Sequence, residues 1–136
     1  MELQVGVKVL LKNREGKYLI LRRSRIKYPN ASGSWTIVGG RINPGDSLLK
    51  NLKREIKEET GLDLNKNPRL VAAQDILRVE GKHIVRLTYI GETDGEVKLN
   101  EENTDFKWVT LDELKGTKDL DEYFKEILNN LNGVAQ

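Results

Sequence analysis

The order of the periodic segments most strongly limits what this chain can fold into. Apolar residues recur at two-residue spacing in some segments, as in strands, and at helical spacing in others. In chain order there are strand patterns over 5–11 and 17–23, a helical pattern over 47–60, strand patterns over 71–79, 84–90 and 106–109, and a helical pattern over 119–131. This order is unlike repeated βαβ units and predicts an α+β fold, a sandwich in which helices cover a mixed sheet.

Length and composition favour one domain over residues 1–136, because a single core typically organises about 100–150 residues. Hydrophobic residues make up 38% and charged residues 32% of the 136 residues. The net charge of +2 arises from 23 basic and 21 acidic side chains, which is too balanced for a stable nucleic-acid partner. No apolar run approaches the ~20 residues of a membrane span, and no signal peptide is recognisable, so we expect a cytoplasmic protein.

Cysteine and histidine usage restricts the chemistry. The chain has no cysteine and one histidine, His83, which excludes thiol nucleophiles and cysteine- or histidine-rich metal sites within one chain. Carboxylates, oxygen-bound metal ions, lysine, arginine, tyrosine and serine remain.

The helical pattern over 47–60 has clear ends, with Asp46 or Ser47 as the N-cap and Gly61 as the stop. On a helical projection its apolar residues share one face, which we expect to pack on the core. These residues are Leu48, Leu49, Leu52 and Ile56. Its lysines share the opposite, solvated face, and they are Lys50, Lys53 and Lys57.

Three glutamates lie along one edge of that apolar face. Glu55, Glu58 and Glu59 are three or four residues apart, which brings their Cβ atoms within about 5–6 Å of one another. One interpretation is that they are ordinary helix glutamates that pair with basic residues one turn away, as Glu58 can with Arg54. The other reading is a metal site, because clustered carboxylates repel one another until a divalent cation joins them. Oxygen ligands of this kind select Mg²⁺, with Mn²⁺ as a substitute.

The residues before the helix extend this pattern into a motif. Gly40, five residues, Asp46, seven residues and then Arg54-Glu55-Ile56-Lys57-Glu58-Glu59-Thr60-Gly61-Leu62 closely resembles the signature of the Nudix, or MutT-like, hydrolases. Asp46 stands where the family has Glu, and Val38 where many members have Pro. We expect the resemblance to cover the whole domain.

This resemblance implies a Mg²⁺-dependent enzyme that hydrolyses the diphosphate linkage of a nucleoside diphosphate joined to another group. The substrate would be a nucleoside triphosphate or a nucleoside diphosphate sugar such as ADP-ribose, and the alternative is a catalytically weak nucleotide- or RNA-binding sensor. Gly40, Glu55, Glu58 and Glu59 would bind the metal and Arg54 would position the glutamates. Glu102, preferred over Glu101, would be a late-loop catalytic acid or ligand.

A basic cluster precedes the motif, at the end of the second strand pattern. One interpretation is substrate binding, in which the arginine guanidinium groups donate paired hydrogen bonds to a phosphate and Tyr28 stacks on a base. Solvated loop residues are the alternative. The predicted substrate-binding residues are Arg22, Arg23, Arg25 and Tyr28. The sequence leaves open whether the protein is a monomer or a homodimer.

Overall fold

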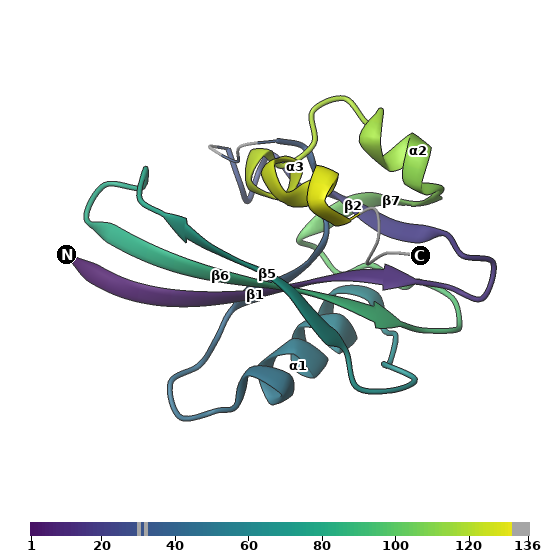
Figure 1. Ribbon diagram of the computed structural model, residues 1–136, viewed down its shortest axis with the longest axis horizontal. Coiled ribbons are helices and arrows are strands. Elements are labelled where there is room, and N and C mark those ends of the chain that lie inside the picture. The colour runs from purple at the N-terminus through teal and green to yellow at the C-terminus, as the bar shows by residue number, and fades with distance from the viewer. Residues whose placement is uncertain (30, 32, 132–136) are drawn as a thin grey trace.

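Helices lie on both faces of one mixed β-sheet in a computed structural model, which describes residues 1–29, 31 and 33–131 (Figure 1). The strands are β1 Glu2–Lys12, β2 Tyr18–Arg23, β3 Trp35–Thr36, β4 Val38–Arg41, β5 Arg69–Ile76, β6 Lys82–Glu92 and β7 Asn103–Val109. The helices are α1 Leu48–Thr60, α2 Leu111–Lys115 and α3 Glu122–Leu128, followed by a 3₁₀ turn at Asn129–Leu131. Helix α1 covers one face, and α2 and α3 lie on the other (Figure 1). The predicted α+β sandwich is confirmed.

Strand β1 organises the sheet because three other strands pair with it. It runs parallel to β6 from Glu2 opposite Lys82 to Lys12 opposite Glu92. It also pairs antiparallel with β4 over residues 6–9 and meets β2 at its end. The outer strands complete the sheet, since β5 pairs with β6, and β3 and β7 pair with β2. The pairing of β1 with β6 brings together segments that are about 80 residues apart in the sequence.

Two apolar clusters, one on each face, follow from the alternation of side chains along β1. Val9 and Leu11 point toward α1, where they pack with Leu52. Leu10 points to the other face and packs with Phe124 of α3. All five residues of this pattern are almost completely buried. No helix among residues 1–29, 31 and 33–131 is both long and apolar enough to cross a bilayer.

Two of the four residues of the predicted apolar face of α1 are not in the core. Leu49 is only partly buried and belongs to neither apolar cluster. Leu52 and Ile56 are fully buried, but Leu48 is 36% exposed. Asn51 is buried in its place: its side-chain oxygen accepts from the Asn43 backbone N–H at 2.8 Å, and its amide donates to the Ser47 carbonyl at 2.7 Å. The prediction for Leu48 was wrong. The spacing of apolar residues does not show that the Asn51 side chain connects the start of the helix to the preceding loop.

The C-terminal helix begins later than the pattern over 119–131 predicted. Asp119 adopts a left-handed backbone with φ 58, and Asp121 is the N-cap of α3, so helical residues start at Glu122. The short α2 was not predicted. It is closed by a capping box in which Thr110 and Glu113 bond each other's backbone N–H groups.

Candidate active site

The two ends of α1 fix which side chains face the sheet. Ser47 is the N-cap, and its hydroxyl accepts from the Lys50 N–H at 3.1 Å. Gly61 takes the left-handed conformation at φ 73, and its N–H donates to the Lys57 carbonyl at 2.9 Å. Between these ends Glu59 is turned inward and is 4% exposed, while Glu58 is turned outward and its side chain is 57% exposed.

Glu55 lies against the backbone of Gly40 in β4. A Cβ atom added to Gly40 would stand 2.9 Å from the Glu55 carboxyl group, closer than real Cβ contacts. Any residue larger than glycine would therefore displace this carboxylate. The glycine lets the carboxylate of α1 approach the main chain of β4, and the Glu55 side chain remains only 14% exposed.

Arg54 lies between the acidic side chains. Its guanidinium is 3.4 Å from Glu55 Oε1, 3.8 Å from Glu58 Oε1 and 3.9 Å from Asp46 Oδ2. The Asp46 contact is the longest of the three, as expected for a side chain one methylene shorter than Glu. Lys50 shares Asp46, at 3.3 Å. Arg54 is therefore within ion-pair distance of both Glu55 and Glu58.

Glu59 is the most strongly perturbed acid of the site. Its pKa is raised from 4.5 to about 9, mainly by burial and in part by the neighbouring Glu55 and Glu102, while the Lys8 ammonium lowers it. Its Oε2 atom is buried and has no hydrogen-bond partner among the described residues. A buried carboxylate oxygen without a partner is costly, so a ligand that pairs with it would be strongly favoured.

The acidic groups offer oxygen donors to a cation without forming a complete cage. Within the described part of the chain, no three His, Asp or Glu side chains are already assembled around one point. Glu58 stands apart because it is solvated and drawn toward Arg54. The unpartnered Glu59 oxygen, the adjacent Glu55 carboxylate and the Gly40 main chain nevertheless fit a hard divalent cation, which prefers oxygen ligands and retains water.

Gly40 and Glu59 open onto a cleft of about 510 Å³ between α1, the sheet and the loop before β7, whereas Arg54, Glu55 and Glu58 do not line it. Three of the predicted metal-site and catalytic residues line it, namely Gly40, Glu59 and Glu102. Residues that the sequence analysis missed also line it, including Lys8, Thr36, Arg41, Lys82 and Arg86. For Lys8 and Arg86 the signal in the sequence was a basic residue between two apolar residues of a strand, as Lys8 is between Val7 and Val9.

Only half of the predicted substrate-binding cluster reaches the cleft. Arg23 and Tyr28 line it. Arg22 is exposed and does not, because it precedes Arg23 on β2 and points elsewhere. Arg25 is held by Asp119 at 3.3 Å and by Ser34 at 2.9 Å, which is a structural role in the loop.

Glu102 and its neighbour Glu101 occupy different environments. Glu102 lines the cleft close to the Tyr28 hydroxyl, whose pKa is raised by burial and by this carboxylate. Its main-chain oxygen accepts from the Ser24 N–H at 2.9 Å, which ties the late loop to the end of β2. Glu101 points outward to Lys27, at 3.1 Å. Of the two candidates, Glu102 is therefore the one that faces the carboxylates of α1.

Comparison with known proteins gives matches along almost the whole described chain. A family model of the NUDIX domain matches residues 2–131. The nucleoside triphosphatase NudI of Escherichia coli (strain K12) is 32% identical over 112 residues, covering 74% of this chain and 77% of that protein. Among solved structures, a MutT protein from Methanosarcina mazei Go1 superposes with a TM-score of 0.82 at 28% identity, covering 97% and 94% of the two chains. A MutT NUDIX hydrolase from Burkholderia pseudomallei shares the fold, with a TM-score of 0.80 at 24% identity and coverage of 97% and 100%.

Proposed function

Since this chain belongs to the Nudix family and is a Nudix pyrophosphohydrolase, we propose that it uses Mg²⁺, or Mn²⁺ in its place, to hydrolyse the diphosphate linkage of a nucleoside triphosphate. The observation that carries the proposal is the buried Glu59 carboxylate, which has an unpartnered oxygen beside Glu55 at the wall of the cleft.

The proposed cation ligands are the Glu55, Glu58 and Glu59 carboxylates and the main-chain carbonyl of Gly40. A doubly charged ion would remove the electrostatic cost of holding Glu59 ionised in a buried position. When bound, it would make water more acidic and neutralise charge on the phosphate oxygens. Glu58 is solvated and can turn from Arg54 to join the other two ligands.

The remaining residues orient groups and move protons. Arg54 positions the glutamates through its contacts with Glu55 and Glu58. Glu102 faces the cleft from the late loop and is suited to accept a proton from the attacking water, because a carboxylate within hydrogen-bonding reach is sufficient for this role. Tyr28 lies beside Glu102 and would contact the nucleoside.

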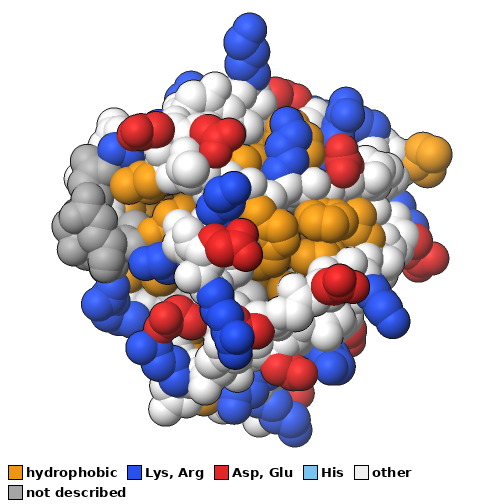
Figure 2. Space-filling view, turned by 90° about the vertical axis from the view of Figure 1, so that its right-hand side faces the viewer, with side chains coloured by type: hydrophobic (Ala, Val, Ile, Leu, Met, Phe, Trp, Pro, Cys, Tyr) orange, Lys and Arg blue, Asp and Glu red, His pale blue; other side chains and the backbone are white. Residues whose placement is uncertain are grey.

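The size of the cleft and the distribution of charge favour a small nucleotide over a nucleic acid. A volume of about 510 Å³ is within the range of small-molecule sites. On the face shown in Figure 2, acidic and basic side chains are interspersed, without the continuous basic stripe that nucleic-acid binding requires. The similarity to a nucleoside triphosphatase supports a triphosphate over a nucleotide sugar.

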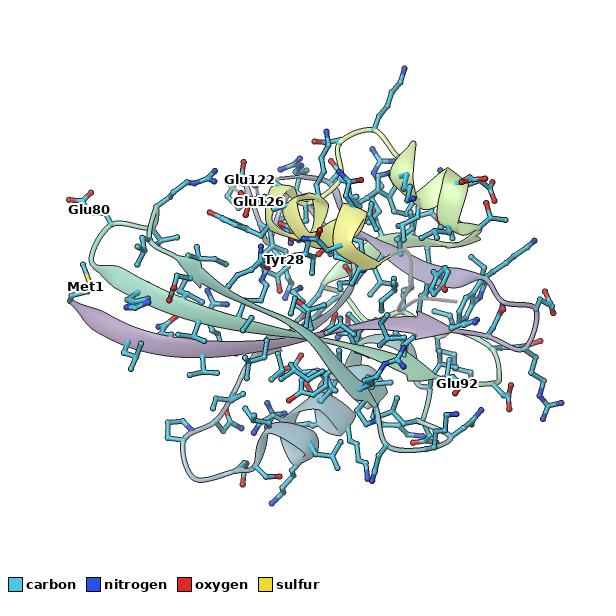
Figure 3. The ribbon with its side chains drawn as sticks, viewed as in Figure 1. Met1, Tyr28, Glu80, Glu92, Glu122 and Glu126 are labelled. Carbon is cyan, nitrogen blue, oxygen red and sulfur yellow. The ribbon has the colours of Figure 1, made fainter. Side chains whose placement is uncertain are left out.

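The proposal is tested by incubating the protein with a panel of nucleoside triphosphates and ADP-ribose, with and without Mg²⁺, and identifying the products by mass spectrometry. We expect cleavage of a triphosphate that requires the metal. Glu58→Gln should lower kcat at least about tenfold by removing one metal ligand. Glu80→Gln is the matched control, since Glu80 lies in the exposed β5–β6 turn, far from α1 (Figure 3). Equal activity of the two variants would remove the metal-site assignment.

A further inference from the structure

Lys8, Arg23 and Arg86 form a group of cations in the cleft, which we call the basic floor. Lys8 is an ordered member of this group. Its Nζ donates to the Ile37 carbonyl at 3.1 Å, and its aliphatic stem crosses Gly39, where an added Cβ would stand 2.8 Å from Lys8 Cδ. Burial, followed by the nearby Arg86 and Arg23 guanidinium groups, lowers the pKa of Lys8 to about 7. A lysine held in this way is a built part of the cleft.

The two arginines are held from behind by one buried carboxylate. Asp121 is 1% exposed, and its oxygens lie 2.5 Å from Arg86 Nη1 and 3.5 Å from Arg23 Nη2. The Arg86 guanidinium also lies over the Tyr123 ring, 5.2 Å from its centroid. Because both guanidinium groups are anchored, their remaining N–H groups have fixed directions.

Asp121 offsets only one of the three positive charges of the floor, so the floor keeps a net positive charge and consists mainly of hydrogen-bond donors. Asp121 supplies a negative charge directly behind the two arginines, which weakens their attraction for a full anion. Arg23 also donates to the Thr36 hydroxyl at 3.0 Å and to the Gly33 carbonyl at 3.5 Å, which leaves fewer of its N–H groups for a ligand. An arginine side chain and the ammonium form of Lys8 donate hydrogen bonds and cannot accept them. A group that presents acceptor atoms therefore matches this surface, and because the phosphates are assigned to the metal at the glutamates of α1, that group is an edge of the nucleobase.

Nucleobases differ in this property. On the edge that lies in the major groove of DNA, guanine presents O6 and N7 as neighbouring acceptors and thymine presents O4, whereas adenine and cytosine carry an exocyclic amino group that donates. An amino group placed against the basic floor would face other donors. The amino group and the side chains of the floor would then both lose hydrogen bonds to water without replacing them.

We propose that the basic floor binds the carbonyl-bearing edge of the substrate's nucleobase, so that the enzyme prefers guanine, thymine or uracil nucleotides, with Lys8 as a specificity-determining residue. This inference rests on the proposed function, because it assumes that the triphosphate chain extends toward the glutamates of α1. A site with donors directed at a substrate oxygen discriminates strongly against an analogue that lacks the acceptor.

The first test compares kcat/KM for dGTP, dTTP, dATP and dCTP between the wild-type protein, Lys8→Met and Lys53→Met. Lys53 is exposed on the far side of α1 and is the matched control. We expect the wild-type protein and Lys53→Met to favour the better keto nucleotide over both amino nucleotides by about tenfold or more. In Lys8→Met this ratio should fall toward one, in addition to any loss of kcat that all four nucleotides share because Lys8 also neighbours Glu59. A wild-type ratio near one, or an equal loss for all four nucleotides in Lys8→Met as expected for a phosphate contact, would overturn the inference.

The second test separates this inference from the proposed function. Binding of GMP, UMP, AMP and CMP to the wild-type protein and to Lys8→Met is measured by calorimetry without metal, so that no hydrolysis is required. Preferential binding of GMP or UMP that depends on Lys8 supports the inference even if the triphosphates are not cleaved. Metal-dependent cleavage combined with equal binding of all four monophosphates would retain the proposed function and refute the role of Lys8.

Discussion

Replacing Glu59 by Gln should make the metal-free protein more stable while abolishing hydrolysis. Burial raises the pKa of Glu59 from 4.5 to about 9, so between these values the folded protein retains a proton that the unfolded chain has released. Stability therefore falls as the pH rises through this window. Each pH unit costs about 1.4 kcal/mol, which sets an upper bound of about 3 kcal/mol at pH 7.

The bound of about 3 kcal/mol already includes the Lys8 ammonium, which lowers the pKa of Glu59. We expect Glu59→Gln to raise the free energy of unfolding by about 1–3 kcal/mol at pH 7. At pH 4 the gain should disappear, because the carboxyl group is then protonated in both states. Gln retains the size of Glu, so no cavity is created.

The measurement is urea unfolding in the presence of EDTA at pH 4, 5.5 and 7, followed by the fluorescence of Trp35 and Trp108. Glu58→Gln is the control, because its side chain is 57% exposed and its charge is already solvated. Its stability should change by less than about 0.5 kcal/mol. A Glu59→Gln protein that is less stable than the wild type at pH 7, or a gain that persists undiminished at pH 4, would refute the electrostatic argument.

Three further changes test the architecture around the site. Leu52→Ala removes a fully buried side chain of α1 and should cost about 2–5 kcal/mol in urea unfolding, and a loss below about 0.5 kcal/mol would mean that it does not pack in the core. Asp121→Asn leaves two largely buried guanidinium groups without their counter-charge and should cost about 3–5 kcal/mol, measured by the same method. Gly40→Ala should lower kcat with little loss of stability, since the added Cβ would displace the Glu55 carboxylate, and unchanged kinetics would argue against that contact.

The sequence alone determined the ends of α1 and the spacing of its acidic side chains. Ser47 and Gly61 mark its ends, and the spacing of Glu55, Glu58 and Glu59 brings acidic groups to one edge, because helix geometry repeats every 3.6 residues in any context. Periodicity could not decide that Glu59 is buried while Glu58 is solvated, since they are adjacent in sequence. It also placed Leu48 in the core, where hydrogen bonds of Asn51 override the simple pattern.

Tertiary structure alone decided which residues share the cleft. Lys8, Arg86 and Asp121 come from β1, β6 and the start of α3, and they meet because β1 and β6 pair in parallel with Gly6 opposite Arg86. In the sequence, Lys8 and Arg86 are only basic residues within apolar strands. Local geometry sets the direction of each side chain, whereas the distance between two strands depends on the register and packing of the whole sheet. That is why the acidic motif was readable from the sequence and the basic floor was not.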